Sequence, residues 1–286
     1  MKKREFENKV IVIAGATGGI GYPTCIQLAR KGAIIVAVGR SVDRLNDLIR
    51  EISLHNPLSF SIESDLSQTG CWPEIANRVW NSFHRIDVLV NCAGVLVPGT
   101  LDSLSDEEIE SVISLNFTMC IRSARAVVPI MKRRQSGQLV FVGSLGGIVP
   151  MPYEALYCAT KFAVRGLSRS LSAELRKSGI RVSHLAPGPV RTPMLTTESG
   201  DPDSTITFAT KPLEAGVVAR SIVSIIRHPR EERIIPRWQG TAAFLLNLSP
   251  RLFSILSPVL HALGRRNQIQ YHEEMISKPL ASGGLQ

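Results

Sequence analysis

Residues 10–21 read VIVIAGATGGIG, an apolar β-branched run that opens directly into a glycine-rich turn. Gly15, Gly19 and Gly21 have the spacing GxxxGxG, and an amphipathic stretch follows them. Glycines permit a tight turn and a close approach of the backbone to a phosphate group, and the helix that follows offers free N–H donors at the positive end of its dipole. The stretch predicts a buried strand, a phosphate-binding loop and a helix; a plain tight turn is the alternative.

The change from an apolar β-branched run to an amphipathic stretch, first seen after residue 10, recurs along the chain. Short β-branched runs alternate with amphipathic stretches, which indicates βαβ units and a parallel sheet. We expect an α/β fold with a doubly wound, Rossmann-type parallel sheet flanked by helices on both faces, as one domain over residues 1–236. The predicted strands are Val10–Ala14, Ile34–Val38, Leu58–Ser61, Val88–Val90, Gln138–Val142, Arg181–Ala186 and an edge strand Ile234–Pro236. The predicted helices are 19–31, 41–55, 71–84, 105–134, 154–178 and 213–228.

Composition limits the class of protein. Of 286 residues, 44% are hydrophobic and 20% are charged, as in a globular domain. The net charge of +9 favours an anionic partner, either a phosphorylated cofactor or a membrane surface. Nucleic acid is disfavoured because the chain has no zinc-ligand spacing, aromatic RNA-binding pattern or long basic run. Five scattered cysteines without a CxxC pair indicate a reducing, cytoplasmic location, and we expect no metal site.

Two segments depart from the alternating pattern. Residues 193–212 are rich in Pro, Gly and Thr and are predicted to be a long loop. Residues 237–286 are predicted to be a helical extension whose part 238–266 is apolar. Ser249-Pro250 and Ser257-Pro258 resemble helix starts and Gly264 a helix end, so two or three short helices are expected, without a membrane span. The extension either covers the core or a subunit interface, or lies peripherally on a membrane with Arg251, Arg265 and Arg266 near anionic headgroups.

Arg40 distinguishes between two cofactors. The second predicted strand ends Val38-Gly39-Arg40-Ser41, where an acidic residue would bind the ribose 2′-hydroxyl of NAD. Arg40 is instead placed to pair with a 2′-phosphate, and Ser41 can add a hydroxyl contact. The sequence therefore predicts NADP(H); a surface arginine without this role is the alternative.

Tyr157 and Lys161 are the candidate reactive pair. They lie four residues apart in a predicted helix and so share one face. A lysine charge about 4 Å away attracts a phenolate by about 4 kcal/mol at most, which would lower the phenol pKa toward neutrality and suit it to general acid/base chemistry. A YxxxK pair is common by chance. Ser144, thirteen residues before Tyr157 at a predicted strand end, and Asn116 in the preceding helix make a site more plausible.

These residues, in this order and approximate spacing, resemble the short-chain dehydrogenase/reductase family over roughly residues 8–236. The resemblance rests on Gly15xxxGly19xGly21, Asp65, Asn91-Cys-Ala-Gly94, Asn116, Ser144, Tyr157xxxLys161 and Pro187-Gly188. It departs from the family pattern at Ala14, where Thr is frequent, and at Cys92, where a second Asn is usual. Both departures concern structural support rather than proton transfer.

The resemblance implies roles for individual residues. Tyr157 would exchange the proton on the substrate oxygen, Ser144 would orient that oxygen, and Lys161 would bind the nicotinamide ribose and lower the Tyr157 pKa. Asn116 would hold a water that links Lys161 to solvent. The implied cofactor-binding residues are Gly15, Thr17, Gly18, Gly19, Ile20, Gly21, Arg40, Ser41, Asp65, Leu66, Asn91, Ala93, Gly94, Tyr157, Lys161, Pro187, Gly188, Val190 and Thr192. A homodimer or homotetramer through the helices at 105–134 and 154–178 is also implied.

The expected substrate is lipophilic, such as a steroid, retinoid, acyl or aromatic carbonyl. The pocket is expected to form from residues 95–100, 145–153 and 193–212, with the C-terminal extension as a further candidate for its wall. The apolar members of the three segments are Leu96, Val97, Leu145, Ile148, Val149, Met151, Met194 and Leu195. The expected reaction is hydride transfer between NADP(H) and an alcohol/carbonyl pair. A non-enzymatic dinucleotide-sensing or scaffold protein on the same fold, and a lyase or epimerase that uses the same tyrosine, remain alternatives.

Overall fold

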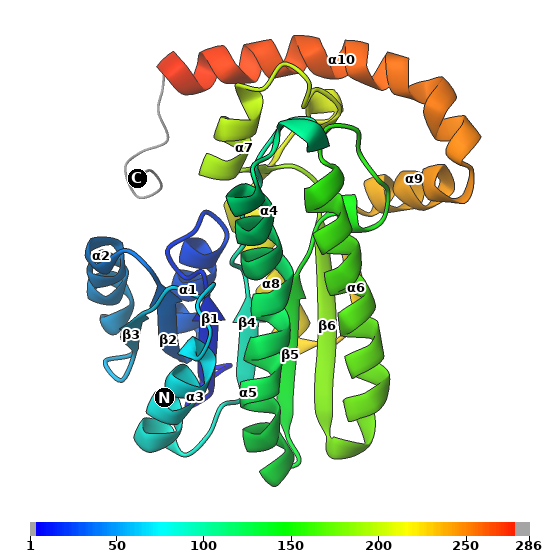
Figure 1. Cartoon of the computed structure of the whole chain (residues 1–286). Coiled ribbons are helices and arrows are strands. Elements are labelled where there is room, and N and C mark those ends of the chain that lie inside the picture. Colours follow the sequence, from blue (N-terminus) through cyan, green and yellow to red (C-terminus); the bar gives the residue numbers. More distant parts are fainter. Residues whose placement is uncertain (1–3, 278–286) are drawn as a thin grey trace.

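A seven-stranded parallel sheet forms the centre of the protein (Figure 1). The computed structural model describes residues 4–277. The strands lie in the order β3-β2-β1-β4-β5-β6-β9. Their bounds are β1 Val10–Ala14, β2 Ile34–Gly39, β3 Phe60–Glu63, β4 Val88–Asn91, β5 Gly137–Val142, β6 Ile180–Pro187 and β9 Glu232–Ile235. The two-residue strands β7 (Val190–Arg191) and β8 (Leu213–Glu214) pair separately. The predicted doubly wound fold is confirmed.

Side chains of the central strands alternate between two helical layers. Val10 and Val12 point into one core and Ile11 and Ile13 into the other, as the two-residue period of a strand requires. The first core is covered by α3 (Cys71–Phe83), α5 (Met119–Arg133) and α6 (Ala155–Leu175), and the second by α1 (Gly21–Arg30), α2 (Val42–Ser53) and α8 (Ala215–Arg227). Both faces of the sheet are therefore buried, which explains the continuous apolar runs of the strands.

The strand order reverses between β1 and β4. At such a point the connections leave the sheet in opposite directions, and a crevice opens at the carboxyl ends of the strands. The Gly15–Gly21 loop follows β1, the Asn91–Gly94 segment follows β4, and Ser144 follows β5. The fold thus brings three predicted motifs to one edge of the sheet.

Most predicted elements differ from the observed ones by one to three residues at an end, and the predicted edge strand Ile234–Pro236 is observed as Glu232–Ile235, because Pro236 precedes α9. The third strand begins at Phe60 rather than Leu58, because Ser59 N–H donates to the Asn56 carbonyl in a turn and leaves Leu58 exposed. The helix predicted over 105–134 consists of α4 (Asp106–Ile113), a π-helical turn Ser114–Thr118 and α5. Asn116 lies in this π-helical turn, a feature found frequently at functional sites.

The predicted loop 193–212 is largely helical. It contains α7 (Pro193–Ser199) and a 3₁₀ turn, Ile206–Ala209. Pro193 occupies the first turn of α7, where its missing N–H has no intrahelical partner to lose. The expectation of an irregular loop is wrong for these two stretches.

The C-terminal extension forms α9 (Arg237–Leu248) and α10 (Pro250–Ser277), not a series of short helices. Pro258 and Gly264 lie within α10 and neither starts nor ends it. A Cβ on Gly264 would lie 1.8 Å from the Thr205 carbonyl oxygen, so glycine permits close contact there instead of ending the helix. Within residues 4–277, no helix is long and apolar enough to cross a membrane.

We call α7, the turn Ile206–Ala209, α9 and α10 together the cover. Figure 1 shows α10 running across α7 above the carboxyl edge of the sheet. Phe208 and Tyr271 are in ring contact at 5.5 Å, and Gln268 donates a 2.6 Å hydrogen bond to the Asp201 carbonyl. Apolar and polar contacts together therefore hold the extension over the crevice.

Candidate active site

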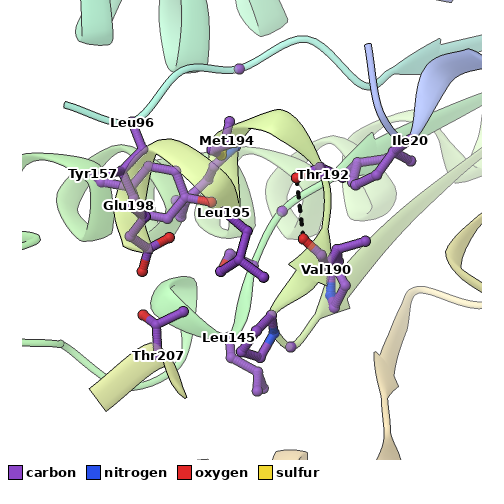
Figure 2. Close-up of a pocket in the computed structure, with 18 of the residues that line it drawn as sticks. Ile20, Leu96, Leu145, Tyr157, Val190, Thr192, Met194, Leu195, Glu198 and Thr207 are labelled. Atoms are coloured by element: carbon purple, nitrogen blue, oxygen red, sulfur yellow. Dashed lines mark hydrogen bonds between the residues drawn. The ribbon is translucent and has the colours of Figure 1, made fainter. Parts of the chain in front are cut away.

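A cavity of about 660 Å³ lies between the carboxyl edge of the sheet and the cover (Figure 2). Most of the predicted site residues line it: Gly15, Thr17, Gly18, Gly19, Ile20, Arg40, Ser41, Leu66, Ala93, Gly94, Ser144, Tyr157, Lys161, Pro187, Gly188, Val190 and Thr192. Four predicted residues, Gly21, Asp65, Asn91 and Asn116, are not part of its lining. The fold thus brings residues from distant parts of the sequence to one cavity.

The glycine loop is packed too closely for side chains. Gly15 has a φ of +74°, and a Cβ there would lie 2.7 Å from the Ala93 nitrogen. A Cβ on Gly21 would lie 2.0 Å from the Gly15 carbonyl oxygen, so Gly21 shapes the loop from outside the cavity. The first turn of α1 has neither a side-chain cap nor an acidic residue. Its N–H groups and dipole therefore suit an anion, which fits the pyrophosphate of a dinucleotide.

Two arginines line the cavity where β2 ends. Arg40 follows β2, and Arg44 lies one helical turn further in α2, where its Nη2 donates to the Thr17 carbonyl at 2.5 Å. Ser41 caps α2 by accepting from Arg44 N at 3.4 Å. Arg44 was not predicted, although its spacing of four residues from Arg40 is a usable signal. The positive charge here fits a phosphorylated ribose.

Asp65 does not face the cavity but binds its own chain. Its carboxylate accepts hydrogen bonds from Ser67 N at 3.0 Å and from Ser67 Oγ at 2.7 Å. These bonds hold the Asp65 pKa below its usual range, with a smaller contribution from Arg40. The neighbouring Leu66 is buried and lines the cavity instead.

Ser144, Tyr157 and Lys161 form a buried group beside the glycine loop. Lys161 is 4% exposed, and its Nζ lies 5.3 Å from the centre of the Tyr157 ring. No carboxylate in the described part of the chain lies within ion-pair distance of Lys161. Ser144 directly follows β5, and its Oγ accepts a hydrogen bond from Gly146 N at 3.1 Å. The ammonium is thus free of acidic competitors and near the phenol.

The pKa of Tyr157 differs from the expectation. Burial raises it above the ordinary value, and a hydrogen bond with Ser144 opposes that rise only in part. Burial also favours the uncharged form of Lys161 and therefore lowers the pKa of its ammonium group. The neighbouring Glu154 and Glu198 raise the Tyr157 pKa further, and the lowering by Lys161 that the spacing predicts is not found, so the phenol remains protonated at neutral pH.

Asn116 and Asn91 support the cavity from behind. Asn116 is buried, its Oδ1 accepts from Val95 N at 2.8 Å, and its Nδ2 donates to the Val95 carbonyl at 2.8 Å and to Thr160 Oγ at 3.2 Å. A Cβ on Gly94 would lie 3.2 Å from Asn116 Oδ1 and 3.3 Å from Lys161 Nζ. Asn91 donates to Ser123 Oγ at 3.0 Å. Asn116 thus ties the segment after β4 to α6, close to Lys161.

The cover supplies several cavity residues that were expected only as part of the 193–212 segment or the C-terminal extension and were not predicted individually. They are Glu198, Thr207, Trp238, Gln239, Ala242, Ala243, Leu246, Phe253 and Leu260. Glu154, directly before α6, also lines the cavity. Gln239 Oε1 is buried without a hydrogen-bond partner among the described residues, and a Cβ on Gly188 would lie 2.1 Å from it. Of the predicted apolar lining, Val97 and Ile148 are absent, since Ile148 packs in a separate small core.

Comparisons with known proteins identify the family of this chain. A family model described as short chain dehydrogenase matches residues 9–203. An uncharacterised oxidoreductase of Staphylococcus epidermidis is 30% identical over 223 residues, covering 78% of this chain and 93% of the relative. The 2,3-dihydro-2,3-dihydroxybenzoate dehydrogenase of Bacillus subtilis is 34% identical over 194 residues, covering 68% of this chain and 74% of the relative.

A solved structure extends the agreement to the fold. A metagenomic short-chain oxidoreductase in complex with NADP is 28% identical, with a TM-score of 0.69, and the match covers 80% of this chain and 97% of that one. The family match spans the glycine loop, Ser144, Tyr157 and Lys161, which the fold gathers around one cavity. The chain belongs to the short-chain dehydrogenase/reductase family of oxidoreductases.

Proposed function

We propose that this protein transfers a hydride between NADP(H) and the alcohol/carbonyl pair of a lipophilic substrate, with Tyr157 as the general acid/base. One observation carries the proposal: Ser144, Tyr157 and Lys161 line the same cavity as the glycine loop. A protein that only binds a dinucleotide has no need of a hydroxyl, a phenol and a buried, uncompensated ammonium together in one cavity.

The chain's own residues account for the proton and for the orientation of the substrate. The bound nicotinamide supplies the hydride chemistry. Ser144 Oγ holds the substrate oxygen, and the protonated Tyr157 phenol donates to that oxygen during reduction. Lys161 places a positive charge beside the phenol and stabilises the phenolate that remains. Asn116 fixes the segment after β4 against α6 and so keeps Lys161 in place. The raised pKa leaves the Tyr157 phenol in the acid form that carbonyl reduction needs but makes it a weaker acid, so the positive charge of Lys161 is needed to stabilise the phenolate that forms.

The preference for NADP(H) is supported by the two arginines at the end of β2. The loop Gly15–Gly21 would hold the pyrophosphate, and Arg40 and Arg44 would bind the 2′-phosphate. The solved relative in complex with NADP is consistent with this assignment.

A lipophilic substrate is supported by the apolar wall around Tyr157. Much of the cavity around Tyr157 is lined by aliphatic and aromatic side chains from the sheet edge and the cover, namely Leu96, Leu145, Val149, Met151, Met194, Leu195, Ile206, Leu246, Phe253 and Leu260. Apolar surface of a substrate that is buried against these side chains contributes about 25 cal/mol per Å² to the free energy of binding.

A spectrophotometric screen tests the proposed function. Purified protein is mixed with NADPH and a panel of steroid, retinoid, long-chain aliphatic and aromatic ketones, and the oxidation of NADPH is followed; the panel is repeated with NADH. We expect turnover of lipophilic ketones with NADPH and weaker turnover with NADH. NADPH binding without turnover of any carbonyl would favour a dinucleotide sensor. Product formation without net NADPH consumption would favour a lyase or epimerase.

We also propose that the outer face of α9 and α10 rests on an anionic lipid surface. Leu245, Leu248, Ile255, Val259 and Leu263 are exposed there. Residues 237–272 contain Arg237, Arg251, Arg265 and Arg266 but no Asp or Glu. This combination of apolar and cationic groups suits anionic headgroups.

Sedimentation with vesicles tests the membrane contact. The protein should bind phosphatidylserine-containing vesicles more strongly than phosphatidylcholine vesicles, and Leu245→Ser combined with Leu248→Ser should weaken that binding. Absence of binding, or dimerisation through this face in size-exclusion chromatography, would contradict the proposal.

A further inference from the structure

Two acidic side chains, Glu154 and Glu198, are buried in the cavity wall beside Tyr157. Each is 4% exposed, and each lines the cavity. Glu154 precedes α6 by one residue, and Glu198 lies near the end of α7. Figure 2 shows the Glu198 carboxyl group between Tyr157 and Thr207. The proposed hydride transfer uses neither carboxyl group.

The hydrogen bonds of the pair leave one acceptor unused. Thr207 Oγ donates to Glu154 Oε1 at 2.8 Å, and the two carboxyl groups are hydrogen-bonded to each other. Two carboxyl groups can bond in this way only when one carries a proton. Glu198 Oε1 is buried and has no hydrogen-bond partner in the described chain. An unpaired acceptor in a cavity wall suits a donor on a bound molecule.

The directions of the two pKa shifts favour Glu198 as the group that carries the proton. Burial raises the pKa of both carboxyl groups, and the pKa of Glu198 is raised further by the neighbouring Glu154 charge. Thr207 lowers the pKa of both carboxyl groups, and its 2.8 Å hydrogen bond goes to Glu154. We therefore assign the proton to Glu198, which donates to Glu154, and the single negative charge of the pair to Glu154.

No cation in the described part of the chain compensates this charge. None of the ion pairs among residues 4–277 includes Glu154 or Glu198. The titratable groups that interact with the pair are Tyr157 and Cys158 on α6 and Asp201 beyond α7. His261 and His272 of α10 contact the neighbouring Thr205 and Ser199. Asp201 adds negative charge. A buried charge without a partner is costly, so a bound donor would stabilise the site.

We propose that the Glu154–Glu198 pair is a recognition subsite for a hydrogen-bond donor, a hydroxyl or a protonated amine, on the substrate. The inference rests on the proposed function, because it adds a second anchor to the cavity that holds the reacting carbonyl. The substrate class is then a hydroxy- or amino-carbonyl compound with an apolar body, rather than a simple ketone. Glu198 touches the donor, and Glu154 is a positioning residue that orients Glu198 and carries the charge.

A matched substrate series tests the subsite in the unmodified protein. Octyl ketones bearing a hydroxymethyl, an aminomethyl or a methoxymethyl group are compared for kcat/KM with NADPH. The methoxy compound cannot donate, so we expect the hydroxy and amino compounds to exceed it by about tenfold or more. Turnover of none of the three would count against the proposed function. Equal turnover of all three would overturn the inference and leave the proposed function intact.

Variants of Glu198 assign the selectivity to the pair. Glu198→Gln keeps the shape, an N–H donor to Glu154 and a free acceptor, and should keep the selectivity within about threefold. Glu198→Leu removes the acceptor and should abolish the preference for both donors. Glu273→Gln, an exposed position on α10, is the control and should match the unmodified protein.

The outcomes for Glu198→Leu separate recognition from other roles. A selective loss for the hydroxy and amino ketones supports the subsite. An equal loss for all three ketones, or an equal loss of selectivity in Glu198→Gln and Glu198→Leu, would overturn it. Glu154→Gln distinguishes the two donors, because removing the charge should lower the preference for the amine by about tenfold more than that for the hydroxyl.

Discussion

The glycine-loop side of the cavity and the cover illustrate two ways of building a binding site. On the glycine-loop side the backbone itself forms the wall, and Gly15, Gly19 and Gly21 leave no room for a Cβ. In the cover the wall consists of side chains such as Leu195, Phe253 and Leu260. Backbone sites recognise groups common to many ligands, whereas side-chain walls can vary with the substrate. We therefore expect substitutions on the two sides to have different effects.

Gly21→Ala should have the largest effect in this comparison. The new Cβ would lie 2.0 Å from the Gly15 carbonyl oxygen, which is backbone and cannot move aside cheaply. We expect the free energy of unfolding to fall by about 3 kcal/mol and NADPH binding to be lost. Urea denaturation and fluorescence titration measure the two quantities.

Gly166→Ala is the matched control for this substitution. Gly166 lies inside α6, and a Cβ there would meet nothing within 4 Å. The free energy of unfolding of this variant should rise by about 0.5–1 kcal/mol, because alanine restricts the unfolded chain and favours the helix. A Gly21→Ala variant as stable as Gly166→Ala would show that the loop has more room than the structure indicates.

Arg40→Ala should have the second largest effect and change only the cofactor preference. Loss of one charged hydrogen-bonding partner costs about 2 kcal/mol, which is roughly thirtyfold in the Kd for NADPH. The Kd for NADH should change by less than about twofold. Arg181→Ala serves as the control, because Arg181 lies at the amino end of β6, whereas the cavity lies at the carboxyl ends of the strands. An equal weakening of both cofactors would contradict a role in binding the 2′-phosphate.

Phe253→Ala should have the smallest effect of the three and act on the substrate. Phe253 lines the cavity from α10, and its truncation removes apolar contact worth about 1.5 kcal/mol. We expect about a tenfold increase in KM for a lipophilic ketone, with kcat and NADPH binding nearly unchanged. Leu248→Ala, at an 80% exposed position of α9, should leave KM unchanged. A fall in kcat alone would indicate that Phe253 acts on the reaction step.

The same contrast explains which features the sequence could reveal. Local sequence patterns predict the strands, the glycine loop, Arg40 and the Ser144–Tyr157–Lys161 group. These patterns indicate the same structure whichever tertiary contacts the rest of the chain makes. Pro258 and Gly264 also carry strong local signals, yet both lie inside α10. Contacts with Thr205, Phe208 and Asp201 stabilise that helix, and such tertiary contacts have no signature in a local pattern.

Glu154 and Glu198 could not be found from the sequence for a related reason. They are forty-four residues apart and become neighbours only because α7 folds over the start of α6. An isolated glutamate in a helical segment is most often exposed to solvent. The pKa of Tyr157 could not be predicted either, since it is raised by burial and by the neighbouring Glu154 and Glu198, none of which the local YxxxK pattern reveals.

The central claim is that Tyr157 supplies the proton while other residues hold the cofactor. It is tested most directly by Tyr157→Phe, with kcat/KM for a ketone and Kd for NADPH measured on the same preparation. Because phenylalanine keeps the ring but has no proton to donate, we predict a fall in kcat/KM of about 10²–10⁴-fold, with a Kd for NADPH within about twofold of the original value. Turnover by Tyr157→Phe equal to that of the unmodified protein would contradict the account.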